Sequence, residues 1–530
     1  MKHFYRQISN ALTDILATEY GSVTVEEPLW EIPQKPGFGD FSTMIALKIA
    51  SQTKENPLVI AEHIKEQLSS RLKGLEKIEV LKPGFVNLFL SREELVGSLN
   101  QLLSEPGDYF RDERGRRVLL EFLSANPTGP LSVAHGRQAI VGDVIANVLE
   151  FCGDEVVREY YVNDAGRQIE LLVESVDARR KELRGEAFVI PEGGYFGDYI
   201  KDVAKTLLDH PRESLRPAIL DCLLGLIRRD LKSLGIEFDN WVSQSALIGE
   251  GKVEESLTSL VYRALAYEQD GAWWFKSTEF GDDKDRVLKK QDGEYTYFAS
   301  DIAYHQNKLS RKFDKLLNLW GPDHHGYIPR VQGIMQALGA SGGLLSVLII
   351  QLVTIKSKER MSRRRGTAIL LSDLVDDVGK DAARFYYISR RNSSPLDFDI
   401  DLARQISFDN PLYYVQYAHA RICSIFEKAG DMKTDLAGSA ALADEEEYLL
   451  LRKLFQFTYC LDKIYYSWEP VFLIEFLKTA ATAFHKFYEQ KKVLDEDPHI
   501  RQARLNLLRA TRITLACGLK LLGITPLEKM

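Results

Sequence analysis

The fold is decided by residues 118–162, VLLEFLSANPTGPLSVAHGRQAIVGDVIANVLEFCGDEVVREYYV, which read as a strand, a loop, a helix and a second strand. The apolar run at 118–122 is typical of a buried parallel strand, and two prolines and a glycine at 126–130 force a loop. Apolar residues then recur at helical spacing, at Val141, Val144, Ile145 and Val148. Cys152-Gly153 ends that helix, and 156–162 supply the second strand. The stretch predicts an α/β protein with a parallel sheet.

The loop in this unit is a candidate nucleotide site. It lies between a parallel strand and a helix, where the free N–H groups and positive dipole of a helix start can hold phosphate. His135 stands at that helix start. A histidine with no such context is more often a capping or core residue.

Length and composition indicate a soluble globular protein. The 530 residues are enough for about three to four domains, and 45% of them are hydrophobic. The longest apolar stretch, 344–353, is too short to span a membrane and predicts a buried strand. The start lacks a hydrophobic signal segment, and the five scattered cysteines form no CxxC pair. We therefore expect a cytoplasmic protein with no membrane contact, no disulfide framework and no structural metal.

The charge pattern leaves nucleic-acid binding open. The net charge of −8 disfavours a generally basic binder, but a local basic surface is sufficient. Candidate basic segments occur at 363–365, 390–391 and 491–512. The alternative for each of them is an ordinary solvated face.

Several further segments, in order along the chain, carry a resemblance to a known family. They are FGDFSTMIALKIA (38–50), NPTGPLSVAHGR (126–137), YYVNDAGRQI (160–169), GPDHHGYIPRVQGIMQALG (321–339), RMSRRRG (360–366), DAARFYY (381–387) and NPLYYVQYAHARI (410–422). Together they resemble the class I aminoacyl-tRNA synthetases, and specifically arginyl-tRNA synthetase.

The resemblance implies a domain organisation and an activity. An α+β accessory tRNA-binding domain (1–103) and a polar linker (104–117) would precede a Rossmann-like catalytic domain (118–400) with an insertion at about 175–290. An all-α anticodon-binding domain (401–530) would follow, with Asn410 capping a helix that has Pro411 in its first turn. The enzyme would activate L-arginine with ATP and transfer it to the 2′ hydroxyl of the terminal ribose of tRNA(Arg). We expect a monomer that needs bound tRNA for activation and has no editing site.

The same resemblance implies an arginine pocket. Tyr297 and Asp301 lie four residues apart, on one face of a predicted helix start, and a carboxylate is suited to bidentate recognition of a guanidinium. Alone, Asp301 could be an exposed or capping aspartate. The family pattern adds Glu121, Ser124 and Asn126, near the amino group of the substrate.

For ATP, supplied with Mg²⁺, two groups of residues are implied. The phosphates and the catalysis would involve His135, Ser132, Arg360, Ser362 and Arg363. Cations aimed at a leaving pyrophosphate stabilise its developing charge. The nucleotide would also be contacted by Pro127, Gly129, Ala134, Gly136, Gly321, Asp323, His324 and Met361. Paired His324 and His325 also invite a metal site, although no further ligand pattern accompanies them.

The sequence departs from the family pattern at one motif. Ser132 replaces the first histidine of the HIGH signature, and Ala134 replaces its glycine. A weakened hydrogen bond there would cost about 1–3 kcal/mol of transition-state stabilisation. This departure leaves open a slower enzyme and a tRNA-binding paralogue without activity. A class I synthetase for another amino acid also stays open, and it would require that the pocket of Glu121, Tyr297 and Asp301 is misassigned.

The predicted tRNA contacts lie at both ends of the chain. Asp40 and Phe41 fall in the N-terminal segment that resembles the family, with Asp40 or Ser42 expected to cap the helix that follows. In the C-terminal domain the resemblance implies Tyr413, Gln416, Tyr417 and Arg421, because aromatic and arginine side chains suit splayed bases.

Overall fold

The structure, a computed structural model, describes residues 3–21, 27–33, 35–356, 369–430, 435–494 and 497–530. The chain forms two compact units, each built from its own contacts. One unit is continuous, from Glu113 to Arg404. The other combines the two ends of the chain, Met1–Asp112 and Gln405–Met530.

The continuous unit is organised around a parallel five-stranded sheet. Its strands, in spatial order, are β11 (Leu345–Ile349), β10 (Lys315–Trp320), β4 (Arg117–Glu121), β5 (Glu155–Val162) and β6 (Asn240–Ser243). The chain passes from β4 to β5 and β6 on one side and then to β10 and β11 on the other. The order therefore reverses between β4 and β10, and such a switch point is where open α/β sheets bind ligands, at the carboxyl ends of the strands.

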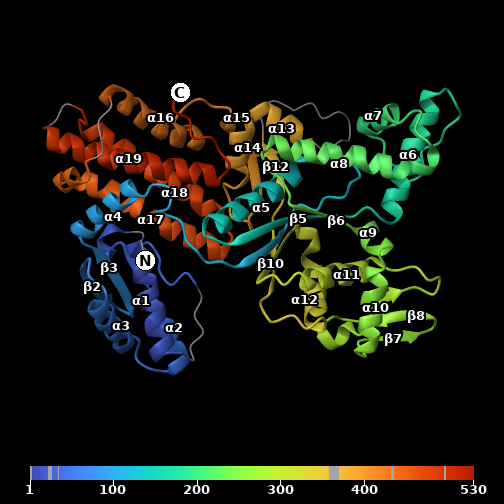
Figure 1. The fold of residues 1–530 in the computed structure, drawn as a ribbon, viewed down its shortest axis with the longest axis horizontal. Coiled ribbons are helices and arrows are strands. Elements are labelled where there is room, and N and C mark those ends of the chain that lie inside the picture. The colour runs from blue at the N-terminus through green and yellow to red at the C-terminus, as the bar shows by residue number, and fades with distance from the viewer. Residues whose placement is uncertain (1–2, 22–26, 34, 357–368, 431–434, 495–496) are drawn as a thin grey trace. The chain divides into compact units, whose positions relative to one another are not determined.

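Helices cover both faces of this sheet, with α8, α13 and α14 on one side and α11 and α12 on the other (Figure 1). The helices of the unit are α5 (Val133–Phe151), α6 (Arg167–Leu183), α7 (Asp198–Thr206), η2 (Arg212–Ser214), α8 (Leu215–Ser233), α9 (Gln244–Gly249), α10 (Lys252–Tyr262), η3 (Ser277–Phe280), α11 (Tyr297–Ser310), η4 (Pro322–Tyr327), α12 (Ile328–Ala337), α13 (Leu371–Val378), α14 (Lys380–Tyr387) and α15 (Ile400–Ala403). Gly142 lets α5 lie close to the sheet, since a Cβ at that position would stand 2.3 Å from the ring of Phe122.

Two smaller sheets complete this unit. One is antiparallel and is made of β7 (Ala266–Gln269), β8 (Ala272–Phe275) and β9 (Arg286–Lys289). The other is the parallel pair β12 (Val353–Lys356) and β13 (Leu396–Asp399).

Two segments of this unit differ from the sequence-based expectation. The range 175–290, expected as an insertion, also supplies β6, the edge strand of the main sheet, because Asn240–Ser243 pairs with β5. The stretch 344–353, expected as one buried strand, is divided between β11 and the start of β12, and its strand residues are only partly buried. Both are short, partly buried strands, for which apolar periodicity is a weak signal.

The other unit joins an α+β half to a helical half. The α+β half contains α1 (Phe4–Glu19), η1 (Pro36–Phe38), β1 (Phe41–Thr43), α2 (Ile45–Thr53), α3 (Pro57–Arg71), β2 (Leu75–Leu81), β3 (Phe85–Leu90) and α4 (Arg92–Ser104). Its antiparallel sheet has the order β1–β3–β2. The helical half contains α16 (Pro411–Ala429), η5 (Ala437–Ala441), α17 (Glu445–Ser467), α18 (Val471–Gln490) and α19 (Pro498–Leu521).

Local details of this unit confirm one predicted cap and correct another. The side chain of Asn410 accepts hydrogen bonds from the backbone N–H groups of Leu412 and Tyr413, with Pro411 in the first turn of α16. Neither Asp40 nor Ser42 caps α2, because Asp40 accepts from the backbone of Leu90 and Ser42 lies within β1.

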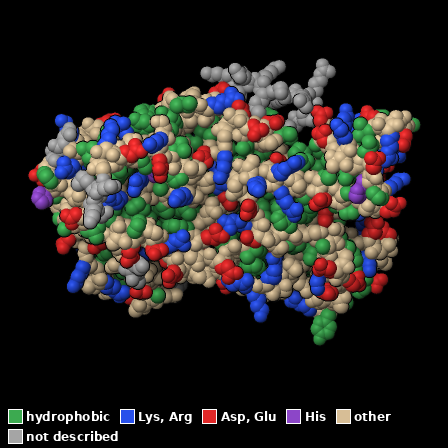
Figure 2. Space-filling view, turned by 45° about the horizontal axis from the view of Figure 1, so that its top comes forward, with side chains coloured by type: hydrophobic (Ala, Val, Ile, Leu, Met, Phe, Trp, Pro, Cys, Tyr) green, Lys and Arg blue, Asp and Glu red, His purple; other side chains and the backbone are tan. Residues whose placement is uncertain are grey.

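The predicted fold class is confirmed: a parallel-sheet α/β region with an α+β N-terminal part and an all-α C-terminal part. Within the described residues, no helix combines the length and apolar character needed to span a bilayer. Figure 2 shows acidic and basic side chains interspersed over the visible face, as expected for a chain with many charges of both signs.

Candidate active site

A cavity of about 630 Å³ opens at the carboxyl ends of β4 and β10. This is the point where the strand order reverses, and the volume lies within the usual range of small-molecule sites. Most of the sequence-predicted substrate residues line it, namely Glu121, Ser124, Asn126, Ala134, His135, Tyr297, Asp301, Gly321, Asp323 and His324.

A strained turn directly after β4 carries one wall of the cavity. Leu123 and Ser124 have positive φ angles, 70° and 39°, which residues other than glycine rarely adopt. The Ser124 hydroxyl donates to Glu121 Oε1 (3.2 Å) and accepts from the backbone N–H of Tyr161 (3.1 Å). The turn therefore ties the end of β4 to β5, and strain of this kind is typical of functional sites.

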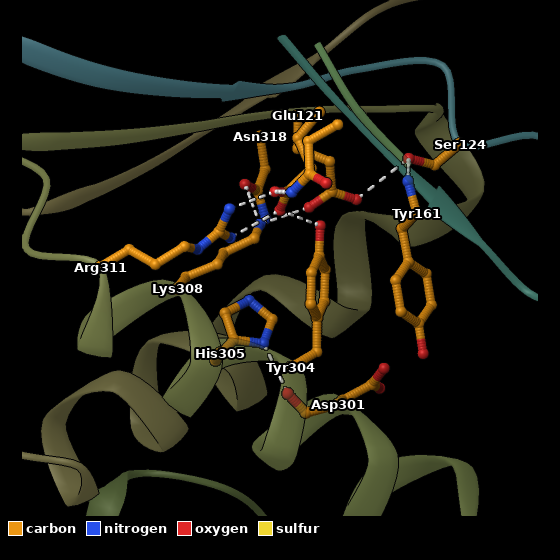
Figure 3. Close-up of polar contacts among 11 residues, drawn as sticks. Glu121, Ser124, Tyr161, Asp301, Tyr304, His305, Lys308, Arg311 and Asn318 are labelled. Atoms are coloured by element: carbon orange, nitrogen blue, oxygen red, sulfur yellow. Dashed lines mark hydrogen bonds and ion pairs between the residues drawn. The ribbon is translucent and has the colours of Figure 1, made fainter. Parts of the chain in front are cut away.

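Beneath this wall lies a buried charge cluster that joins β4, β5, α11 and β10 (Figure 3). Lys308 Nζ, fully buried, donates to Glu121 Oε2 (2.5 Å) and to Asn318 Oδ1 (3.0 Å). The same cluster contains Glu159, whose carboxylate accepts hydrogen bonds from the Arg311 guanidinium (2.5 and 2.9 Å) and from the Tyr304 hydroxyl (2.8 Å).

Electrostatics keep Glu159 ionised. Burial opposes the charged form, but the hydrogen bond from Arg311 and the nearby charge of Lys308 lower the pKa of Glu159 below its usual value. Buried charges persist only when they are paired in this way, so the cluster fixes the floor of the cavity.

Asp301 and Tyr297 lie in the first turns of α11, as predicted. The Tyr327 hydroxyl donates to Asp301 Oδ2. Burial, with the negative charge of Glu121 nearby, raises the pKa of Asp301 to about 7. Tyr297 is half exposed, and its hydroxyl lies against Gly166. A cation in the cavity would favour the ionised form of Asp301.

His135 also lines the cavity, from the first turn of α5. Its Nδ1 accepts from the backbone N–H of Ser132 (3.0 Å), so in the neutral ring the proton is on Nε2. Burial lowers the pKa of His135, which favours this neutral form. The ring therefore offers an N–H donor, and the methyl group of its neighbour Ala134 is exposed in the same cavity.

Four other predicted residues do not line the cavity. Ser132 holds the ring of His135 through its backbone, and Pro127 is buried in the loop. Gly129 packs against the ring of Tyr199. Gly136 faces α13 and α14, because a Cβ there would stand 2.7 Å from Leu371 and Tyr387 side-chain atoms. These residues shape the loop and helix start, and no contact with a ligand in the cavity follows from their positions.

The predicted basic loop residues Arg360, Met361, Ser362 and Arg363 lie outside the described residues. The chain that follows them is fixed next to the start of α5. The backbone N–H of Val133 donates to Ile369 (3.1 Å), and that of Leu371 donates to Leu131 (2.8 Å).

Sequence reasoning missed a set of unsatisfied polar atoms in the cavity wall. Five of them are buried without a hydrogen-bond partner among the described residues: Tyr161 Oη, Asn163 Oδ1, Gln244 Oε1, His305 Nε2 and Asn318 Nδ2. Buried polar groups are normally paired, so atoms of this kind are suited to a bound ligand. Tyr161 and Asn163 belong to a segment with a family resemblance, 160–169, but nothing in the sequence singles out the other three.

Gln244 is held in place by its neighbours. The side chains of Ser243 and Ser245 donate to Asp164 Oδ2 (2.6 and 2.8 Å), and the Ser245 backbone donates to Oδ1 (2.8 Å). Asp164, two residues after β5, thereby fixes the start of α9, where Gln244 is the first residue. The backbone at Gln244 is thus held in place, and its buried amide oxygen belongs to the cavity wall.

Of the two adjacent histidines, only His324 lines the cavity. His324 lines the cavity next to Trp320, with ring centroids 6.0 Å apart, whereas His325 is exposed outside it. Among the described residues, no three His, Cys, Asp or Glu side chains are grouped so that they could hold a metal ion.

Three of the predicted tRNA-contact residues point inward. Phe41 is fully buried, with its ring 5.2 Å from that of Tyr5, and Asp40 is buried against the backbone of Leu90. Gln416 is also buried and donates to the Thr525 carbonyl (3.3 Å). Their side chains therefore do not face solvent, because their strand and helix faces pack against the rest of the unit.

The remaining predicted residues of α16 belong to a partly exposed aromatic surface. Tyr413 and Tyr417 stack with ring centroids 6.1 Å apart, and Arg421 donates to the Tyr488 hydroxyl (2.8 Å). Exposed Phe408 packs its ring on Tyr417 (5.0 Å), and His485 adjoins the same group. Phe408, His485 and Tyr488 were not predicted.

The predicted basic segments differ in their exposure. Arg390 and Arg391 are exposed. In the 491–512 segment, Arg504 is buried and paired with Glu447 (2.7 Å) and Asp444 (3.0 Å). Part of that segment is therefore structural, and 363–365 lie outside the described residues.

Comparisons with known proteins identify the family of the chain. Three family models match the chain: the arginyl-tRNA synthetase N-terminal domain at residues 2–90, the class I (R) tRNA synthetase catalytic domain at 98–194 and 208–397, and the DALR anticodon-binding domain at 415–530. Together they cover almost the whole chain.

Curated relatives are similar over nearly their full length. The arginine–tRNA ligase of Thermotoga maritima is 40% identical over 99% of both chains. That of Bacillus licheniformis is 42% identical over 96% of this chain and 95% of its own. The solved arginyl-tRNA synthetase of Thermus thermophilus has the same fold, with a TM-score of 0.78 over 99% of this chain and 100% of its own at 22% identity. The chain therefore belongs to the arginyl-tRNA synthetases of class I.

Proposed function

We propose that this arginine–tRNA ligase forms arginyl-adenylate in the cavity at the carboxyl ends of β4 and β10. The observation that carries the proposal is the presence of a carboxyl group, Asp301, and of a neutral N–H donor, His135, in the lining of one cavity. The first suits a guanidinium, and the second suits a phosphate.

Arginine is proposed to bind along α11 and the turn after β4. Its guanidinium would pair with Asp301, beside Tyr297 and the amide oxygen of Gln244. Its ammonium group would lie near Glu121, Ser124 and Asn126. Glu121 can accept further hydrogen bonds, because pairing with Lys308 and Ser124 uses only part of the capacity of its two oxygens.

This pocket supports the expectation of no editing site. A cavity that meets a guanidinium with a buried carboxyl and unpaired acceptors rejects analogues lacking those N–H groups, since its own polar atoms stay unsatisfied.

ATP is proposed to occupy the side of the cavity near α5 and η4. Ala134, Gly321, Asp323 and His324 would adjoin the nucleoside, and His135 Nε2–H would donate to a phosphate. Arg360, Met361, Ser362 and Arg363 are proposed to contact the nucleotide and its phosphates together with Mg²⁺. Their supporting observation is the sequence motif, with the chain after it joined to the start of α5.

The reaction itself needs no protein nucleophile. The ionised carboxylate of arginine attacks the α-phosphorus of ATP, a phosphorus–oxygen bond breaks, and pyrophosphate leaves. The terminal ribose hydroxyl of tRNA then attacks the arginyl carbonyl. The bond between the carbonyl carbon and the phosphate oxygen breaks, AMP leaves, and the hydroxyl proton is released. The chain's task is to align these groups and to stabilise charge on the phosphates.

The tRNA contacts are also proposals. The aromatic surface of α16, with Tyr413, Tyr417 and Arg421, would stack on anticodon bases, and the N-terminal domain would contact the outer corner of the tRNA. We propose that the protein acts as a monomer in the cytoplasm and needs bound tRNA to activate arginine.

The test is arginine-dependent ATP–pyrophosphate exchange, with and without cognate tRNA. His135→Ala is expected to lower exchange about 10- to 100-fold or more, because a donor to the phosphates is lost. His325→Ala is the matched control: it removes a neighbouring exposed histidine outside the cavity and should leave the rate unchanged. Absence of exchange in the wild-type chain, with tRNA still bound, would favour the inactive paralogue.

A further inference from the structure

Two adjacent tyrosines of β5 differ in whether their hydroxyl groups have a hydrogen-bond partner. The side chains of Tyr160 and Tyr161 lie on opposite faces of the sheet, as alternation in a strand requires. The Tyr160 hydroxyl donates to the Ala125 carbonyl (2.7 Å). The Tyr161 hydroxyl is buried in the cavity wall with no hydrogen-bond partner in the described part of the chain.

The position of Tyr161 is nevertheless fixed. Its ring stacks on that of Tyr304, with centroids 4.3 Å apart and an interplanar angle of 23°. Lys308 Nζ lies 4.4 Å from the centroid of the Tyr304 ring. The Tyr161 backbone is held by the Ser124 hydroxyl. An unpaired buried hydroxyl lowers stability, so a rigid one in a cavity wall is suited to a ligand that completes its hydrogen bonding.

The surroundings of this hydroxyl identify the kind of ligand. Its end of the ring lies toward the Asp301 carboxyl group in Figure 3. Burial and the negative charges of Asp301, Glu121 and Asp164 raise the pKa of Tyr161, so the phenol stays neutral. A neutral phenol can accept a hydrogen bond from a cationic N–H donor and does not add another charge beside the carboxylates.

We propose that Tyr161 is an arginine-binding residue, whose hydroxyl accepts a hydrogen bond from the guanidinium group held by Asp301. This inference rests on the arginine site proposed above. It assigns Tyr161 a direct contact with the substrate, in addition to its packing against Tyr304. Binding strength gained in this way is present before and during the reaction, so its loss raises KM for arginine with little change in kcat.

The test compares Tyr161→Phe with the wild-type full-length enzyme in steady-state aminoacylation. The variant keeps the stacked ring and removes only the hydroxyl. KM for arginine is expected to rise about 10- to 100-fold, the usual effect of losing a hydrogen bond to a charged group. KM for ATP and for tRNA should stay the same, and the thermal unfolding midpoint should not fall, since no internal hydrogen bond is lost.

Tyr160→Phe is the matched reference for stability. It removes a paired hydroxyl from the neighbouring residue and leaves the Ala125 carbonyl unsatisfied, so its unfolding midpoint should fall below that of Tyr161→Phe.

Two results would overturn the inference about Tyr161 alone. One is a Tyr161→Phe enzyme with an unchanged KM for arginine. The other is an enzyme in which all three KM values rise together with a fall in the unfolding midpoint, which indicates a structural role. A wild-type chain that binds tRNA but does not use arginine would overturn the proposed site and this inference together.

Discussion

At the scale of single residues, the carboxyl group of Asp301 determines the pH at which the cavity can hold a cation. Burial raises its pKa to about 7, so a large fraction is protonated in the free enzyme at neutral pH. Only the ionised form pairs with a guanidinium. The kcat/KM for arginine is therefore expected to be constant above pH 7 and to fall about tenfold per unit below it.

This pH dependence is measured from about pH 5.5 to 8.5 at saturating ATP and tRNA. Asp301→Asn serves as the control: it should lose about 2–5 kcal/mol of arginine binding and show no inflection near pH 7. His135 does not account for the inflection, because burial lowers its pKa. A profile that is flat down to pH 5.5 in the wild-type enzyme would contradict the assignment of Asp301.

Gly166 leads to a second prediction, because both its backbone conformation and its contact with Tyr297 disfavour a side chain at this position. Its φ is +85°, and a Cβ would stand 2.1 Å from the Tyr297 hydroxyl oxygen. Gly166→Ala is expected to destabilise the protein by about 1–2 kcal/mol and, by displacing Tyr297, to raise KM for arginine roughly tenfold.

Gly185→Ala is the control that separates the effect of backbone strain from the effect of the contact with Tyr297. Gly185 has a similar φ of +73°, but nothing lies within 4 Å of a Cβ at that position. This variant should lose about 1 kcal/mol in chemical denaturation through backbone strain alone. If both variants raise KM for arginine equally, the contact between residue 166 and Tyr297 does not matter for binding.

At the scale of elements, β4, α11 and β10 are joined under the cavity by the pairing of Lys308 with Glu121 and Asn318. Lys308→Met should destabilise the protein by about 3–5 kcal/mol, because it leaves the buried Glu121 carboxylate without a counter-charge. The free energy of unfolding in urea measures this.

The double variant Lys308→Met/Glu121→Gln, together with the two single variants, forms a double-mutant cycle. It should recover much of the lost stability, since Glu121 is then no longer an unpaired buried charge, but not arginine activation, since Glu121 is a proposed arginine-binding residue. Additive effects of the two substitutions on stability would show that the pair is not coupled.

The same elements mark the limit of prediction from sequence. The strand, loop, helix and strand of 118–162 were predicted nearly to the residue, because apolar periodicity, prolines and Gly153 are local signals. The Lys308–Glu121 pair joins residues 187 positions apart, and no local pattern indicates it. Gln244 was missed for the same reason, since its position depends on Asp164 at the end of another strand.

Local signals also do not indicate which of the predicted tRNA-contact residues are buried. Asp40 and Phe41 lie in a segment that resembles a tRNA-binding domain, but their side chains face the interior. Gln416 lies on the same helix as Tyr417, yet it is buried against the end of the chain. A helix or strand has several faces, and the family resemblance of a segment does not say which face binds.

At the scale of the whole molecule, the family and its three parts were predictable, because motifs in the expected order extend along most of the chain. The insertion at 175–290 was the exception. It supplies β6 to the main sheet, which a charged, helical sequence with one short strand does not reveal.

The unit made from both ends of the chain has a consequence for synthesis on the ribosome. Tyr5, Phe41 and Phe110 pack their rings against residues of α17 (Phe41–Phe455 at 6.0 Å and Phe110–Phe457 at 4.7 Å, for example). The N-terminal segment emerges first but must wait, for roughly tens of seconds at ordinary elongation rates, until α17 has been translated. Meanwhile the continuous unit between them can fold, and a nascent chain with exposed aromatic side chains is a natural client of chaperones.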